Sequence, residues 1–226
     1  MCGIFTQMAS WEGVVTFSEA LTSSDGPART VRPMDFADVV CLDETGTRVT
    51  RKMRWGGAKK GSTAPGNRPE NIHAQAEKLD GYWLYLAQQR GILITRTFNE
   101  GKEVSKSKTD QYTFTPKDGQ PLGIAVIYEK WEREDGSELY TFIMMTTPAN
   151  RQIIDNEITD RMPAVLTPDK WAVWLGETNA SVEEAKALLV PVDGDWTMEA
   201  APKNKKTSKP APQKPPAPQD PQFDLF

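Results

Sequence analysis

The sequence predicts an α+β fold in which a mainly antiparallel, barrel-like sheet is flanked by a few peripheral helices. Short segments rich in β-branched and aromatic residues recur along the chain, and turn residues separate many of them. Only a few stretches have helical spacing of apolar residues, so strands dominate. The 226 residues are 38% hydrophobic and 26% charged, which allows one sizeable core or two small ones.

Each element follows from local patterning. The strands at 39–42 and 48–54 form a hairpin around the turn at 43–46, and the turn at 117–119 joins the strands at 112–115 and 122–131. Strands are expected, in chain order, at residues 4–8, 39–42, 48–54, 91–97, 112–115, 122–131 and 139–147. Helices are expected at 18–22, 76–89, 169–175 and 181–189. The third begins after Thr167-Pro168, and the fourth with the capping box at 181–184. The stretch at 56–69 has no apolar periodicity and is expected to be a long loop.

The composition divides the chain into three parts. Residues 1–198 form the predicted folded domain. Residues 199–221 are dominated by proline, lysine, alanine and small polar residues, which cannot bury a core, so we expect a disordered tether. The last five residues, 222–226, restore apolar character to the end of this polar segment.

Composition also limits the function. The formal net charge of −4 is not that of a general nucleic-acid binder. Residues 51–60, however, hold five cations and Trp55 without an acidic residue, a pattern that suits either a single-stranded nucleic-acid groove or a solvated loop. One histidine and two cysteines in no metal-ligand spacing predict neither a metal site nor a disulfide. Without a signal sequence or an apolar run of about 20 residues, a cytoplasmic protein outside the membrane is expected.

Cys2 is the candidate nucleophile. It follows the initiator methionine, whose removal would leave an α-amine and a thiol on adjacent carbons. Their ordinary pKa values, about 8 and about 8.5, leave both groups partly nucleophilic near neutral pH. Such a pair can capture one aldehyde twice, as an imine and then as a five-membered thiazolidine. The alternative is an ordinary residue at a frayed terminus.

The C-terminal peptide is a candidate docking motif. It resembles the short peptides with which bacterial DNA polymerases and repair proteins bind the sliding clamp. In that mode the leucine and the last phenylalanine fill an apolar pocket and the glutamine bonds at its rim. The alternative is a tail that packs on its own domain. The motif consists of Gln222, Phe223, Asp224, Leu225 and Phe226.

Six segments, taken together in order and spacing, resemble the SRAP family of abasic-site processing proteins over residues 1–198. These segments are Met-Cys-Gly at 1–3, Arg-Trp-Gly at 54–56, His-Ala-Gln-Ala-Glu at 73–77, Asp-Gly-Gln-Pro at 118–121, the strand at 143–147, and Ile-Thr-Asp-Arg-Met-Pro at 158–163. The resemblance implies binding to abasic sites in single-stranded DNA. It also implies cross-linking of the N-terminal cysteine to the ring-opened sugar as a thiazolidine.

The resemblance also implies the catalytic residues. Cys2 matches the nucleophile, and Glu100 matches a glutamate at the end of a strand that would shuttle protons. Taken alone, Glu100 would be an ordinary solvated carboxylate. The family asparagine falls on His73, with Asn71 as the rival placement. A lone histidine is usually structural, but here we expect His73 to contribute acid–base chemistry. The family histidine falls on Thr159, which cannot act as a general base near neutral pH.

The DNA contacts implied by the resemblance are changed in part. Ile4 and Gln75 stand where the family has cationic residues, whereas Arg161 is retained. Trp55 matches an aromatic residue beside the DNA, although a core tryptophan is the alternative. The expected DNA-binding residues are Pro33, Arg54, Trp55, Lys59, Lys60, Asn71, Gln75 and Arg161.

The sequence therefore predicts an abasic-site sensor that forms a covalent DNA–protein cross-link and is recruited by the sliding clamp. We expect a monomer without cofactors, encoded by a bacterium, a phage or a plasmid. Two other hypotheses remain. One is a non-catalytic adaptor with a degenerate site, and the other is a cysteine protease, for which no Cys/His pair is evident.

Overall fold

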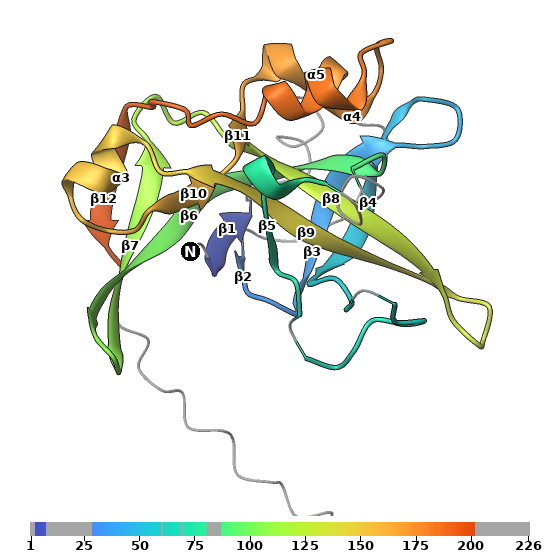
Figure 1. Cartoon of the computed structure of the whole chain (residues 1–226), viewed down its shortest axis with the longest axis horizontal. Helices are drawn as coiled ribbons and strands as arrows, with labels where there is room; N and C mark the ends of the chain where they lie inside the picture. Colours follow the sequence, from blue (N-terminus) through green and yellow to red (C-terminus); the bar gives the residue numbers. More distant parts are fainter. Residues whose placement is uncertain (1–2, 8–28, 60, 69, 81–86, 202–226) are drawn as a thin grey trace, which may run out of the picture.

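The computed structural model describes residues 3–7, 29–59, 61–68, 70–80 and 87–201. Their strands belong to one twelve-stranded sheet (Figure 1). The strands are β1 (Ile4–Gln7), β2 (Thr30–Val31), β3 (Phe36–Leu42), β4 (Arg48–Trp55), β5 (His73–Gln75), β6 (Arg90–Ser105), β7 (Lys108–Pro116), β8 (Leu122–Glu132), β9 (Glu138–Pro148), β10 (Arg161–Pro163), β11 (Val165–Leu166) and β12 (Trp196–Ala200). The described helices are η1 (Ala76–Lys78), α3 (Arg151–Asp155), η2 (Pro168–Lys170), α4 (Trp171–Leu175) and α5 (Val182–Ala187).

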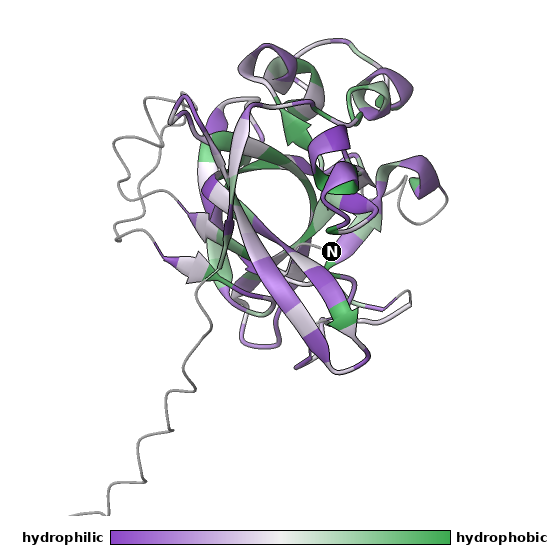
Figure 2. Cartoon of the chain, turned by 90° about the vertical axis from the view of Figure 1, so that its left-hand side faces the viewer, coloured by the Kyte–Doolittle hydropathy of each residue, from purple (hydrophilic) through white to green (hydrophobic). Residues whose placement is uncertain are grey.

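A ring of strands closes the sheet into a barrel, seen end-on in Figure 2. β3 pairs with β4 and β6, β6 with β8, β8 with β9, and β9 returns to β4. Only the β4–β9 pairing in this ring is parallel. The predicted mainly antiparallel, barrel-like fold with few helices is therefore confirmed.

Two apolar clusters follow from the alternation of side chains along the ring strands. Phe142 and Met144 of β9 belong to the first cluster, whereas Ile143 and Met145 belong to the second. The second cluster includes residues of α4 and α5, so it lies between the sheet and these helices. The first cluster, which includes Trp55, fills the barrel.

The strand β6 organises the molecule. The sequence predicts a buried strand at 91–97, but β6 spans 16 residues. Its first part pairs with β3 and β8, and its second part pairs with β1 and β7. The turn at 117–119 therefore joins two strands that each pair with β6, because β6 is long enough to hold both.

Other predicted elements need correction. The helix predicted at 76–89 begins as the short η1, residues 79–80 lie outside any helix, and residues 81–86 lie outside the described part of the chain. The predicted helix at 18–22 also lies outside it. The helix at 169–175 is η2 followed by α4, and α5 has the predicted capping box. Finally, β12 extends to Ala200, two residues past the predicted domain end.

Candidate functional site

Glu100 lies in the middle of β6 and is completely buried, with 0% of its surface exposed. It pairs with Tyr112 of β7. The prediction that it stands at the end of a strand is wrong, because β6 continues to Ser105. The alternative of a solvated loop carboxylate is also wrong. A carboxyl group withdrawn from water in this way is suited to proton transfer when a reactant reaches it.

The N-terminal strand leads toward Glu100. β1 pairs with β6 in antiparallel register, so Ile4 faces Asn99, the residue before Glu100. Gly3 is the first residue that the structure describes, and Cys2, the predicted nucleophile, lies outside the described residues. Lys60 and the C-terminal peptide at 222–226 lie outside them as well.

His73 and Asn71, the two candidates for the family asparagine, have different environments. His73 begins β5, pairs with Met144 of β9, and its ring meets Trp55 edge-on with centroids 5.9 Å apart. Asn71 has a left-handed backbone conformation with φ of 45°, and its side-chain amide donates to the Ala58 carbonyl. The Asn71 side chain therefore anchors the loop at 56–70. This leaves His73 as the candidate on the strand, together with Gln75, which pairs with Thr146.

Trp55 is a core residue, with 0% of its surface exposed. Its Nε1 donates to the Ile72 carbonyl at 2.9 Å, and its ring packs against Phe5 and Phe142. A ring enclosed in this way has no free face for a DNA base. The predicted DNA contact of Trp55 is therefore wrong in this conformation, and the alternative of a core tryptophan is correct.

We expect Trp55→Ala to lower the free energy of unfolding by about 3–5 kcal/mol, because it empties the centre of the barrel cluster. Urea unfolding of both proteins measures the difference. The matched control is Trp131→Ala on β8, where the indole is only half-buried and a smaller loss is expected. Loss of DNA binding by Trp55→Ala with stability unchanged would contradict the core assignment.

The described cations of the basic stretch, at residues 51–59, do not form one surface. Arg51 stacks over the Tyr140 ring at 5.1 Å, and Lys52 pairs with Asp38 at 3.4 Å. Lys59 is exposed on the loop and lies 3.6 Å from Glu70. Alternation along β4 sends neighbouring side chains to opposite faces, which the count of cations alone does not reveal.

Arg54 has neighbours that sequence reasoning missed. It pairs with Thr141 of β9, whose hydroxyl accepts from the indole Nε1 of Trp131 at 3.0 Å. Burial, followed by the nearby charge of Arg133, lowers the pKa of Arg54 from its ordinary value. Arg54 and the half-buried Trp131 therefore both lie beside Thr141, and the charge of Arg133 acts on Arg54. The polar alternation of β8 is the only sequence signal for this patch.

Pro33 lies, half-buried, in a tight turn between β2 and β3. The Arg32 amide donates to the Asp35 carboxylate at 2.9 Å, and the Asp35 amide donates back to the Arg32 carbonyl. The next residue, Met34, has a φ of 78° and donates to the Trp55 carbonyl. The turn therefore packs on the end of β4.

Arg161 is buried, and its guanidinium group is hydrogen-bonded within the protein. Its guanidinium pairs with the Glu77 carboxylate through two contacts and also donates to the carbonyl and the hydroxyl oxygen of Thr146. Its side chain is only 8% exposed. The predicted phosphate contact of Arg161 is therefore not available in this conformation.

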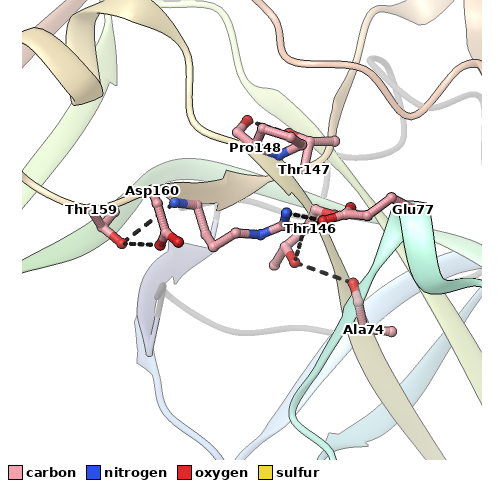
Figure 3. Close-up of polar contacts among 8 residues, drawn as sticks. Ala74, Glu77, Thr146, Thr147, Pro148, Thr159 and Asp160 are labelled. Carbon is pink, nitrogen blue, oxygen red and sulfur yellow. Dashed lines mark hydrogen bonds and ion pairs between the residues drawn. The ribbon is translucent and has the colours of Figure 1, made fainter.

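Thr159 stands just before Arg161, where the family histidine was expected. Its hydroxyl donates to the Asp160 carboxylate at 3.4 Å and accepts from the Arg161 amide at 3.5 Å. This turn thus carries the carboxylate of Asp160 and no imidazole (Figure 3).

Acid is expected to remove the contribution of the Glu77 contact to stability. The hydrogen bond from Arg161 lowers the pKa of Glu77 below its ordinary value. The stabilisation is therefore complete above about pH 4.3, the pKa of an unfolded glutamate, and is lost as the pH falls through the folded-state pKa. The difference in free energy of unfolding between the protein and Glu77→Gln should shrink between pH 7 and pH 3. A difference that is independent of pH would contradict this.

Two absences concern only the part of the chain that the structure describes. It contains no group of three histidine, cysteine, aspartate or glutamate residues placed to hold a metal ion. It also contains no helix long and apolar enough to cross a membrane.

Known proteins share the fold, and some share about a quarter of the aligned residues. The chain is 28% identical to the abasic site processing proteins YoqW and YoaM of Bacillus subtilis over 207 residues, covering 88% of this chain and 91% and 89% of theirs. A crystal structure from Bordetella bronchiseptica superposes with a TM-score of 0.74 at 19% identity, covering 89% of this chain and all of the other. One from Bacteroides thetaiotaomicron superposes with a TM-score of 0.72 at 18% identity, covering 88% and 91%.

The family assignment rests on the whole domain. The sequence model of the SOS response associated peptidase family, SRAP, matches residues 1–210. The match includes both the N-terminal strand and the segment around Arg161. The chain therefore belongs to the SRAP family.

Proposed function

We propose that this protein is an abasic-site processing enzyme that links Cys2 covalently to abasic sites in single-stranded DNA. The observation that carries the proposal is the buried Glu100 on β6, beside the strand that leads from the N-terminus. The named function of the Bacillus relatives, abasic site processing, supports the same class of substrate.

The reaction balances without a cofactor. After removal of Met1, the α-amine of Cys2 attacks the aldehyde of the ring-opened sugar and expels one water as the imine forms. The thiol sulfur then adds to the imine carbon, and its proton moves to the nitrogen, which closes the thiazolidine. Glu100 is the proposed proton shuttle for sugar ring opening and loss of water. Removal of Met1 by the protein itself is the proposed peptidase step.

The described cations provide a path for DNA. Lys59 is exposed on the loop that follows β4, and Arg54 and Arg133 lie close together near Trp131. Phosphates attract such cations, and the half-buried indole of Trp131 offers part of its surface for a base to stack on. We propose Arg54, Lys59 and Lys60 as phosphate contacts, and the peptide at 222–226 as the ligand of a sliding clamp.

The second candidate function is a non-catalytic adaptor. Three observations favour it: Thr159 replaces a histidine, Ile4 and Gln75 replace cations, and Glu77 occupies Arg161. An adaptor would bind DNA or the clamp normally and form no covalent product.

A denaturing gel separates these functions. Protein with a verified N-terminal cysteine is incubated with labelled single-stranded DNA that contains one abasic site. An adduct that survives boiling is expected, whereas DNA with a tetrahydrofuran abasic analogue, which has no aldehyde, should give none. Absence of an adduct together with retained DNA binding would favour the adaptor.

A further inference from the structure

We infer that Arg161 is a positioning residue, which fixes the His73 strand against the turn at 159–160. With Glu77, Thr146 and the Ala74 carbonyl it forms what we call the Arg161 brace (Figure 3). The effect of the brace on activity rests on the proposed function, but its effect on the position of His73 does not.

The contacts of the brace form a continuous network. Arg161 Nη2 lies 2.8 Å from the Thr146 carbonyl oxygen, 3.0 Å from its hydroxyl oxygen and 3.1 Å from Glu77 Oε2, while Nη1 donates to Glu77 Oε1. The Thr146 hydroxyl donates in turn to the Ala74 carbonyl at 3.3 Å. A two-pronged contact between arginine and carboxylate fixes orientation as well as distance.

The brace lies where two short strands meet. β5 and β10 have three residues each, and both pair with β9 at Thr146, through Gln75 and Pro163 respectively. Such short strands make few backbone hydrogen bonds of their own. A side chain that ties both to β9 therefore determines where His73 and the turn at 159–160 lie relative to each other.

The environment of Arg161 argues against a role as a phosphate contact. Its side chain is almost fully buried, and both of its terminal nitrogens are occupied. Turning outward to reach DNA would break these contacts and leave the Thr146 carbonyl without the donor that it has here. Arg161, which the sequence predicts as a DNA contact, therefore makes its contacts within the protein.

Binding and rate distinguish the two roles. The variants are Thr146→Val, which changes no charge, its conservative control Thr146→Ser, and Glu77→Gln. We measure the Kd for undamaged single-stranded DNA by fluorescence anisotropy and the cross-linking rate constant at saturating abasic DNA. For Thr146→Val and Glu77→Gln the rate constant should fall at least about tenfold, because small misplacements near reacting groups are costly. The Kd should stay within about threefold, and Thr146→Ser should behave as the unmodified protein.

If Arg161 instead binds phosphate, Glu77→Gln frees it, so the DNA affinity should rise while the rate constant at saturation is retained. That result would overturn the inference. Circular dichroism and thermal unfolding of each variant exclude loss of the fold as the cause of a slower reaction.

A readout independent of activity uses the fact that His73 is the only histidine in the chain. Its imidazole gives a single set of NMR signals. In Thr146→Val these should shift or broaden, and in Thr146→Ser they should overlay those of the unmodified protein. Unchanged His73 signals in Thr146→Val would refute the brace. If the His73 signals shift in Thr146→Val but the unmodified protein forms no cross-link, the proposed function is refuted and the brace still holds.

Discussion

Replacing Cys2 with alanine is expected to abolish the adduct with abasic DNA that survives boiling. The new terminus keeps its α-amine and can still form an imine, but without the thiol the imine stays open to hydrolysis. Borohydride, which reduces an imine to a stable amine, should therefore restore an adduct. This recovery would demonstrate that the variant still folds and binds DNA.

The other cysteine is the matched control. Cys41 is completely buried, and burial raises the pKa of its thiol to about 11, so it is neither accessible nor ionised near neutral pH. Cys41→Ala should keep the adduct. A stable adduct that persists in Cys2→Ala and disappears in Cys41→Ala would refute the proposed chemistry.

Replacing Glu100 with glutamine is expected to slow cross-linking by about 10²-fold or more, the usual contribution of a positioned acid–base group. Glutamine has nearly the same shape, so the barrel should remain folded, but it cannot donate and recover a proton. Single-turnover gels at saturating DNA measure the rate constant.

The control for this variant lies on the same strand. Glu103 is an exposed glutamate of β6, and Glu103→Gln should react at the unmodified rate. If Glu100→Gln kept the unmodified rate, or lost rate only through weaker DNA binding, Glu100 would not be the proton shuttle.

Much of the fold could be predicted because local patterns determine it. The hairpin of β3 and β4 follows from alternating residues around a turn that ends in Gly46, whose φ is 81°. The capping box at Ser181 likewise begins a helix. The pairing of β6 with four strands is a long-range property, since no local pattern encodes which strands meet along a 16-residue element.

The candidate site was less predictable, for a similar reason. Trp55 lies within a basic stretch, yet strand alternation places its ring inside the barrel. The sequence predicts that Arg161 is available to DNA, because its partner Glu77 is 84 residues away and no local pattern reveals the pairing. Glu100 is buried by strands that no local pattern around it predicts. It became a candidate through the family resemblance.

The most direct test of the central claim is the intact mass of the purified adduct, followed by proteolysis to locate the DNA. The expected mass is that of the chain without Met1, plus the DNA, minus one water, with the DNA on the peptide that begins at Cys2. An adduct that retains Met1, or DNA attached to any other peptide, would contradict it.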